Sequence, residues 1–577
     1  MNARKWRKVS LAALIGTVTV VSACSKGGES SSGSSSPSPS TAASSSPSAS
    51  AAPSVANGPL TKYPQEITVT TVRSANAATK YQAGDTLDSN IWTKSFKADL
   101  NINVTNKWTV SDQQFKNKLT VSMVSGDLPD FFLVDDQQLQ LLVQAGQIMD
   151  LTDLYNKYAT DLTKQTFGND MKSVRMQAAT FGGKLMAIPN GGGSHDDLPM
   201  VWVRKDWLDA LNLQPPKTMD DVMNIAKAFA NNDPDKNGKK DTFGLSLDYN
   251  LWGGWSGLDG FFNGYGAYAF NPTKGSGTNL VFLKGADGKP AYADIQPEVK
   301  TALGKLQELF KAGAINPEFS VIDGAKSGEL ATQGKVGMSF GQWWVGTWPI
   351  ADMKKADPKV EWQAYPLVSA DGKPVKGLST SALPTKFYVI NKNAKNPEAV
   401  FKLLNYFNEK VYGKTPDETY HQVVKDGTTY QVFSYAPIVG TPTETNQNDY
   451  EAIQAALQSN DATKLTPAAN TYYTAIQKYK TGDFGNFVWW STFGPSGAFG
   501  ILGNYKKNNL VVESGYTAPP TETMVSKGPT LRDLEAKAFT KIIMGDPLDS
   551  FDDFVKQWKQ QGGDQILKEV AESGKFN

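Results

Sequence analysis

One stretch of the chain has the residue types and spacing to hold a metal ion. It runs from Asp233 to Asp241, with oxygen-bearing side chains at relative positions 1, 3, 5 and 9 and a glycine at position 6 for a tight turn. A hard cation such as Ca²⁺ needs a ring of oxygens of this kind. Gly244 replaces the usual bidentate Glu at position 12, which predicts weak affinity of ~10⁻⁴–10⁻³ M and a structural role. A solvated Asn-Gly turn is the alternative. The expected ligands are Asp233, Asp235, Asn237, Asp241 and the backbone carbonyl of Lys239.

Aromatic residues gather in three glycine-rich segments, 251–265, 340–348 and 487–493. Sugar rings stack their apolar C–H faces on flat side chains, and their hydroxyls need fixed donors and acceptors, so this make-up suits a carbohydrate. The segments have no clean helical or strand periodicity, so we expect loops or helix starts that display the rings, with at least two of them at the ligand. The alternative is that half or more of these rings belong to the core. Trp207 and Trp558 lie on helical patterns and are expected in the core. The expected ligand contacts are Trp252, Trp255, Tyr265, Gln342, Trp343, Trp344, Trp489 and Trp490.

Polar residues also follow predicted strands. Arg73 and Asn76 come after the first strand, Asp135 and Asp136 after the third, and Asn190 after an Ile-Pro pair. Ligands of open α/β sheets bind at the carboxyl ends of strands. We therefore add Arg73 and Asn190 to the expected ligand contacts; the alternative for each of these residues is an ordinary turn position.

Composition excludes several kinds of site. The 577 residues carry 58 Lys and Arg against 57 Asp and Glu, so the net charge of +1 gives no reason to expect a nucleic acid partner. A single cysteine, Cys24, rules out an internal disulfide and a cysteine-rich zinc site. The only histidines are His195 and His421, which nearly excludes a multi-histidine metal centre.

The first residues predict export and anchoring. Four of the first eight residues are basic, Arg4, Lys5, Arg7 and Lys8, and residues 11–21 form an apolar run too short to span a bilayer. The run ends in Val-Ser-Ala-Cys, which resembles the bacterial lipobox and implies a signal peptide over 1–23 and lipidation of Cys24, palmitate included. Residues 24–58, rich in Ser, Pro and Ala, are expected to be a disordered linker. The protein is thus expected on the outer face of the cytoplasmic membrane.

Alternating elements position these residues. The sequence predicts strands at 67–72, 102–105 and 131–134, with helices at 92–100 and 112–124 between them, which is typical of a largely parallel sheet. Helices are also expected at 219–231 with Thr218 as N-cap, 297–312, 397–407, 531–543, 550–560 and 565–571. The fold class is α/β.

Several segments, in order, resemble the extracellular solute-binding proteins of ABC importers, related to maltodextrin- and alginate-oligosaccharide-binding proteins. They include Ser125-Gly-Asp-Leu-Pro-Asp-Phe131, Phe181-Gly-Gly-Lys-Leu-Met-Ala-Ile-Pro189, the run 203–218 that contains Arg-Lys-Asp-Trp-Leu, Gln333–Met338, Asn396–Val400 and Phe539–Gly545. The resemblance covers residues 60 to 577. It implies a two-lobed fold of the type II periplasmic-binding-protein kind, with ligand in the cleft between the lobes and no catalysis. It also implies a last calcium ligand directly after position 9, where this chain has Thr242.

The resemblance sets the expected domains and partners. Lobe 1 is expected over 59–202 plus 386–455 and lobe 2 over 203–385 plus 456–577, with crossings near 201–204, near 383–389 and between 437 and 468. The expected function is that of a monomeric, membrane-anchored binding component that delivers an oligosaccharide to ABC permease subunits, without a catalytic cofactor. A secreted carbohydrate-active enzyme, which needs only two carboxylates, and a binder of a non-sugar solute remain alternatives.

Overall fold

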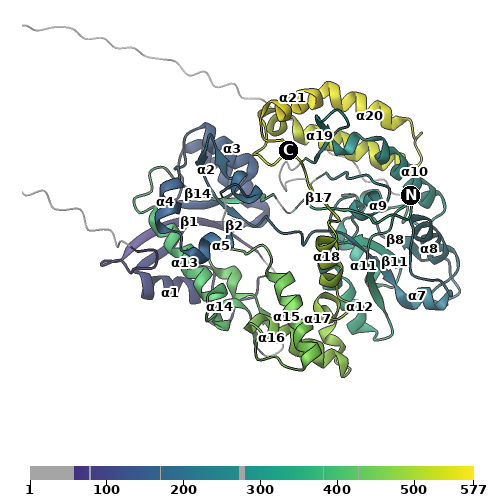
Figure 1. The fold of residues 1–577 in the computed structure, drawn as a ribbon, viewed down its shortest axis with the longest axis horizontal. Helices are drawn as coiled ribbons and strands as arrows, with labels where there is room; N and C mark the ends of the chain where they lie inside the picture. The colour runs from purple at the N-terminus through teal and green to yellow at the C-terminus, as the bar shows by residue number, and fades with distance from the viewer. Residues whose placement is uncertain are drawn as a thin grey trace, which may run out of the picture. The chain divides into compact units, whose positions relative to one another are not determined.

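The computed structural model describes residues 58–576 except 77–78, 169–170, 272–279, 381–382 and 426–427 (Figure 1). The predicted signal peptide, the predicted lipidation site Cys24 and the predicted linker as far as residue 57 lie outside the described residues. Within the described part of the chain, no helix combines the length and the apolar character that crossing a bilayer requires.

Two hydrophobic cores organise the described chain. The first core takes its residues from Tyr63 to Ile188 and again from Phe387 to Ile438. Its elements are β1 (Ile67–Ala75), α1 (Ile91–Leu100), β2 (Ile102–Ser111), α2 (Asp112–Ser125), β3 (Phe131–Asp135), α3 (Asp136–Gln144), α4 (Thr152–Tyr158), α5 (Asp161–Thr166), α6 (Val174–Gln177), β4 (Thr180–Phe181), β5 (Lys184–Leu185), β6 (Ile188–Asn190), β14 (Lys386–Ile390), α13 (Glu398–Tyr412), α14 (Glu418–His421), β15 (Val423–Lys425), β16 (Thr428–Tyr430) and η4 (Val432–Tyr435).

The second core takes its residues from Leu198 to Val375 and from Ile453 to Val570. Its elements are β7 (Met200–Arg204), α7 (Lys205–Ala210), α8 (Met219–Asn231), β8 (Phe243–Leu245), α9 (Asp259–Gly264), β9 (Phe282–Lys284), β10 (Pro290–Tyr292), α10 (Pro297–Lys311), α11 (Gly324–Thr332), β11 (Val336–Gly341), η3 (Trp343–Gly346), α12 (Ile350–Ala356), β12 (Trp362–Tyr365), β13 (Gly377–Leu378), α15 (Thr445–Ser459), α16 (Pro467–Lys480), α17 (Phe487–Phe493), α18 (Ala498–Lys507), β17 (Val511–Val512), α19 (Glu522–Met544), α20 (Ser550–Trp558) and α21 (Asp564–Glu572).

The sheets are mixed, and the expectation of a largely parallel sheet is wrong. β1 and β2 pair in parallel, as do β8 and β11. In the first core, however, β14 inserts between β3 and β6 and runs antiparallel to both, and in the second core β7 runs antiparallel to β11 and β12. In the first core β14 returns from late in the chain and enters the sheet from the other direction, and local βαβ alternation carries no sign of it.

Helix termini follow their capping chemistry. α8 occupies the predicted residues 219–231, because the Thr218 hydroxyl accepts a hydrogen bond from the Asp221 amide at 3.2 Å and the Asp221 carboxylate accepts one from the Thr218 amide at 3.0 Å. α19 begins at Glu522 rather than at the predicted residue 531, since Pro529 lies inside the helix and the cap is Thr521. Trp207 and Trp558 are confirmed as core residues, with 2% and 1% of their surfaces exposed.

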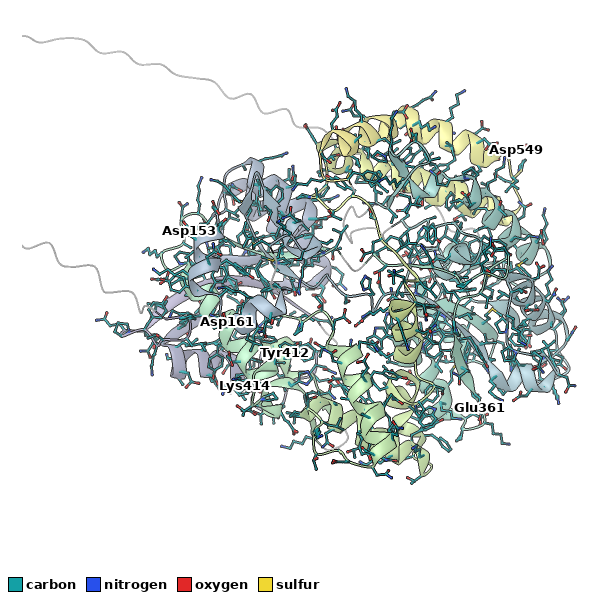
Figure 2. All side chains as sticks on the ribbon, viewed as in Figure 1. Asp153, Asp161, Glu361, Tyr412, Lys414 and Asp549 are labelled. Carbon is teal, nitrogen blue, oxygen red and sulfur yellow. The ribbon has the colours of Figure 1, made fainter. Side chains whose placement is uncertain are left out.

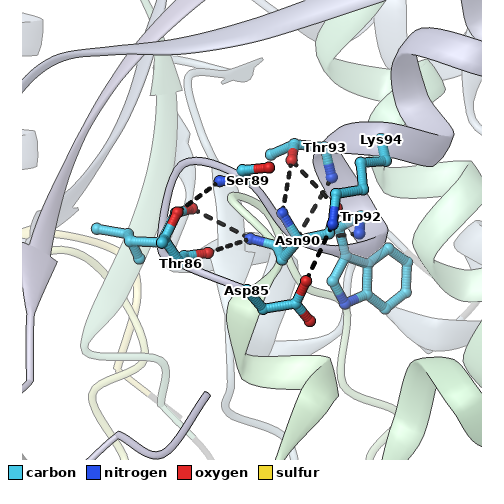
Figure 3. Close-up of polar contacts among 8 residues, drawn as sticks. Asp85, Thr86, Ser89, Asn90, Trp92, Thr93 and Lys94 are labelled. Atoms are coloured by element: carbon cyan, nitrogen blue, oxygen red, sulfur yellow. Dashed lines mark hydrogen bonds and ion pairs between the residues drawn. The ribbon is translucent and has the colours of Figure 1, made fainter. Parts of the chain in front are cut away.

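The cap of α1 fixes a tryptophan of the first core (Figure 3). The Asn90 side-chain oxygen accepts hydrogen bonds from the amides of Trp92 at 3.0 Å and Thr93 at 3.4 Å, and its nitrogen donates to the carbonyl of Thr86 at 3.0 Å. The indole of Trp92 is fully buried, donates to a backbone carbonyl of η4 at 2.9 Å and stacks on Phe407 of α13 at 4.9 Å. This places α13, which packs beside α4 and α5 in Figure 1, firmly on the first core.

Three segments connect the two cores. The first is 191–197, the second is 379–385, and the third lies between Ile438 and Ile453. Residues 201–204, near which a crossing was expected, form β7 of the second core, so the chain crosses a few residues earlier. The crossings touch one another: a Cβ on Gly192 would stand 2.8 Å from the backbone nitrogen of Pro384, and one on Gly193 would stand 2.7 Å from the methyl group of Thr443.

Candidate functional site

A cavity of about 790 Å³ lies where segments of the two cores meet. Its walls come from the end of α13 and from α14, from the third crossing, from α16 and α17, and from the start of η3. Tyr412 and Lys414, labelled in Figure 2, stand where α13 ends. The volume falls within the ~300–1,000 Å³ that small-molecule sites occupy.

One wall of the cavity belongs to a stack of aromatic rings that we call the aromatic stack: Trp489, Tyr472 and Phe493, which line the cavity, and Phe499, which is buried behind them. Trp489 and Tyr472 stack at a centroid distance of 4.3 Å, Tyr472 and Phe493 at 4.8 Å with their planes 3° apart, and Phe493 and Phe499 at 5.2 Å. Trp343 packs on Phe499 at 5.5 Å. The rings hold each other in place, so Trp343, Tyr472 and Trp489, which all line the cavity, present fixed apolar surface to it.

Polar groups with few partners face the same space. Burial raises the pKa of Tyr412 and of Tyr472 to about 12 each, and neither hydroxyl has a hydrogen-bond partner among the described residues. Burial also raises the pKa of Asp449 to about 6, and the bond that its carboxylate accepts from the Thr466 hydroxyl is long, at 3.4 Å. A ligand that brings hydroxyl groups would satisfy donors and acceptors that the protein itself leaves open.

Histidine and backbone positions complete the lining. His421 stacks on Phe433 at 5.6 Å, and burial lowers the pKa of its imidazole. Asp196 of the first crossing accepts a hydrogen bond from the side-chain nitrogen of Asn446 at 2.8 Å. Because Asn446 lies at the start of α15, this bond connects the first crossing to the third crossing. The cavity therefore borders the first and third crossings.

Two of the predicted tryptophans line this cavity, Trp343 and Trp489. Their neighbours do not: Trp344 donates its indole hydrogen to the Gln342 side chain at 2.6 Å, and Trp490 stacks on Tyr479 at 5.0 Å. Gln342 also accepts a hydrogen bond from Trp202 on its backbone carbonyl.

The segment 251–265 is core rather than cavity wall. Trp252 and Trp255 are 5% and 2% exposed and pack within the second core, Trp255 against Trp362 at 5.7 Å. Tyr265 is half-buried against Phe261, and burial raises the pKa of its hydroxyl. Among the described residues that line the cavity, none of these three rings is found.

The strand-end residues have structural partners. Arg73 donates to the backbone carbonyls of Tyr435 at 2.7 Å and Ser434 at 3.2 Å, and Asn190 pairs with Lys386 in the sheet. Asp135 caps α3. Asn76 is exposed, Asp136 is buried, and neither lines the cavity.

Sequence reasoning missed Tyr412, His421, Asp449 and Tyr472. They lie on or beside regular helices, where their helical spacing looks like that of any packed face. Only the rarity of histidine in this chain, with His421 one of two, offered a signal.

The predicted metal loop keeps its carboxylates together. The Asn237 side-chain nitrogen donates to Asp235 at 2.7 Å and to Asp241 at 3.2 Å, while Asp233 accepts the backbone amides of Asn237 and Gly238 at 3.0 Å each. Desolvation and then the hydrogen bond with Asp233 raise the pKa of Asp235, as expected for crowded carboxylates.

Two residues limit this donor set. Asp241 also forms an ion pair with Lys335. Thr242 is 3% exposed, and its hydroxyl donates to the backbone carbonyl of Phe229 in α8 at 2.7 Å, so it faces the core and does not join the loop's oxygens. Among the described residues, no cluster of three or more His, Cys, Asp or Glu side chains is arranged to hold a metal ion.

The sequence model of bacterial extracellular solute-binding proteins matches residues 77–414, more than half of the chain. The chain belongs to this family. Among its relatives, the polygalacturonan/rhamnogalacturonan-binding protein YtcQ of Bacillus subtilis is 26% identical over 81% of this chain and 84% of its own length. The fructooligosaccharide ABC transporter substrate-binding protein FusA of Streptococcus pneumoniae is 30% identical over 37% of this chain and 39% of its own length.

Solved structures share the fold of this solute-binding protein. The alginate-binding protein AlgQ2, crystallised without calcium, superposes with a TM-score of 0.57 at 17% identity, over 90% of this chain and 99% of its own. FusA in complex with kestose gives 0.58 at 17% identity, over 88% and 98%. The fold is the two-lobed α/β fold of solute-binding proteins.

Proposed function

We propose that this protein is the extracellular, lipid-anchored substrate-binding component of an ABC importer, and that it binds an oligosaccharide in the cavity and delivers it to membrane permease subunits. The observation that carries the proposal is the aromatic stack beside open hydroxyl and carboxylate groups in one cavity. Flat rings and fixed polar groups are what a sugar needs. The names of relatives that bind polygalacturonan or fructooligosaccharide support the ligand class.

The absence of catalysis is part of the proposal, because the relatives named above are binding proteins. Incubation with oligosaccharides is expected to leave every glycosidic bond intact, which product analysis by mass spectrometry measures. Cleavage would favour a secreted carbohydrate-active enzyme instead.

Binding is tested with a matched pair of tryptophans on α17. Trp489 lines the cavity and Trp490 does not, although they are adjacent residues of one type. In calorimetric titrations with an oligosaccharide panel, Trp489→Ala is expected to weaken binding by roughly 10-fold or more, as for other tryptophans at the centre of an interface. Trp490→Ala is expected to stay within about threefold of the wild type. Equal losses, or no response to any sugar, would refute the assignment of the cavity.

Anchoring stays a prediction because Cys24 lies outside the described residues. Cells that express the protein are expected to incorporate labelled palmitate into it, and Cys24→Ser is expected to abolish both the label and membrane retention. A labelled Cys24→Ser protein would contradict the lipobox interpretation. The lobe boundaries given by sequence likewise stay a prediction, since the cores locate the lobes but not their limits.

We further propose that Asp233, Asp235, Asn237 and Asp241 hold a structural calcium ion, without Thr242. Three carboxylates and an amide share hydrogen bonds in this loop, and a divalent cation in place of the Asn237 amide hydrogens would relieve their crowding. Millimolar calcium is expected to raise the unfolding temperature, and Asp235→Asn to remove that rise. Glu318→Gln, an exposed acidic position outside the loop, serves as the control. An unchanged calcium response in Asp235→Asn would contradict the site.

A further inference from the structure

The charges around the cavity are mostly negative. Four carboxylates line it: Asp196, Asp417, Glu418 and Asp449. Two ammonium groups line it: Lys414 and Lys464. No arginine is among the described residues that form the walls. A carboxylate ligand is normally bound by arginine or by several cations, and this cavity supplies neither in excess.

The positive groups are also in the wrong place for an anionic ligand. Lys414 and Lys464 are exposed, so water and salt screen their charge. Asp449 is buried, with 8% of its surface exposed, and no cationic side chain of the described chain lies within salt-bridge distance of its carboxylate. Glu418 is exposed as well, so the charge of the interior comes mainly from Asp449 and from Asp196, one of whose carboxylate oxygens is buried.

Two further groups keep the interior negative or neutral. One side-chain oxygen of Asp196 is buried without a hydrogen-bond partner in the described structure, so an acceptor is left open. The nearby Lys506 already pairs with Glu444 at 2.5 Å. His421 stays neutral at pH 7 because burial lowers the pKa of its imidazole.

We infer that the ligand is an uncharged oligosaccharide and that the cavity rejects sugars carrying uronic acid groups. The inference rests on the proposed function and names the class of sugar that the same cavity takes. Hydroxyl groups of a neutral sugar donate to Asp449 and Asp196, while its C–H faces lie on Trp489 and Trp343. A uronate carboxylate would meet these aspartates as a like charge, and the buried carboxylate of Asp449 is screened less by water and salt than an exposed one.

The relative YtcQ has a name that points to the opposite class of ligand. Its name describes binding of polygalacturonan and rhamnogalacturonan, which are acidic polymers. At 26% identity the cavity lining is free to differ between the two proteins, and the acidic lining of this cavity predicts that it does.

The test compares sugars that differ only in charge. A glycan array with both classes identifies a ligand for the full-length protein, and calorimetry then measures that ligand beside its charged or neutral counterpart, such as trigalacturonate and its methyl ester. The neutral form is expected to bind tighter by on the order of 100-fold, because like charges placed side by side in a binding interface repel. Its affinity is expected to change less than about twofold between low and physiological salt.

Charge variants locate the source of the selectivity. Asp449→Asn is expected to narrow the gap between neutral and acidic sugar by about 10-fold, because it removes the buried like charge. Asp461→Asn makes the same change of charge on an exposed residue outside the cavity and is expected to leave the gap intact. Tighter binding of the acidic form, or an equal gap in both variants, would overturn the inference while the proposed function stands. Failure of every sugar to bind would overturn the proposed function itself.

Discussion

Replacement of Gly192 by alanine is expected to strain the junction between the first and second crossings. Gly191, Gly192 and Gly193 all have positive φ angles, of 83°, 80° and 78°. A Cβ on Gly192 would stand 2.8 Å from the backbone nitrogen and 2.9 Å from Cδ of Pro384. An alanine Cβ is fixed to the backbone, so the overlap is relieved only if the backbone moves. A Cβ on Gly191 would have no atom within 4 Å. Gly191→Ala is therefore a matched control for the backbone conformation alone.

The magnitudes separate the two effects. A left-handed non-glycine residue costs about 1–2 kcal/mol, and both variants carry this cost. The overlap with Pro384 adds about 1–3 kcal/mol to the Gly192→Ala variant, because one of the two crossings has to move. Gly192→Ala is thus expected to lower the free energy of unfolding by about 1–3 kcal/mol more than Gly191→Ala.

The assay is urea unfolding followed by tryptophan fluorescence at equal protein concentration.

A further pair of variants tests the contact at Gly193, where an added Cβ would stand 2.7 Å from the Thr443 methyl. Thr443→Ser removes that methyl and is expected to restore part of the stability lost in Gly193→Ala, with a coupling of about 1 kcal/mol. Equal losses for Gly191→Ala and Gly192→Ala, or no rescue by Thr443→Ser, would refute the reasoning that the crossings are in contact.

Three further substitutions test buried and ionised groups. Asp294 and Glu535 are fully buried side by side, and burial raises the pKa of Asp294 to about 7. The contribution of Asp294 to the free energy of unfolding is therefore greatest below about pH 4 and falls as the pH rises to 7. In urea unfolding, Asp294→Asn should have a free energy of unfolding that rises relative to the wild type by roughly 1–4 kcal/mol between pH 5 and 8. A hydrogen bond to Glu513 at 2.7 Å raises the pKa of His195, so this pair stabilises the fold below about pH 6.5 and the effect is lost as the pH rises through the folded-state pKa. His195→Gln should therefore lower the thermal midpoint at pH 5.5 and leave it unchanged at pH 9. A larger loss at pH 9 than at pH 5.5 would contradict this. Trp92→Ala should cost about 3–5 kcal/mol of unfolding free energy, and a loss below 1 kcal/mol would mean that its pocket collapses.

Much of the secondary structure was predictable because its signals are local. Thr218 as N-cap placed the start of α8 at the observed residue, and in the structure it forms a capping box with Asp221. The helical spacing around Trp207 and Trp558 likewise marked both rings as core. The helix predicted at 531–543 begins earlier, at Glu522, and contains Pro529, a residue type that usually ends or kinks a helix.

The candidate site was less predictable because burial is not a local property. Trp489 and Trp490 are adjacent and identical in type, yet one lines the cavity and the other packs on Tyr479. Trp252 stands in a glycine-rich segment that looked exposed, and it is packed inside the second core. No periodicity separates these cases, since the partner of each ring comes from elsewhere in the chain.

By itself, the sequence determined the α/β class, the Thr218 cap of α8 and the oxygen-rich loop at 233–241, because each depends on residues a few positions apart. It also determined the family, through several short segments that occur in a fixed order along the chain. The tertiary structure decided the direction of β14 and β7, the contact of Gly192 with Pro384 and the meeting of Tyr412, Asp449 and Tyr472 around one cavity. These features depend on segments that are distant in the chain, and the burial that changes the pKa of Asp449 exists only when those segments are packed together.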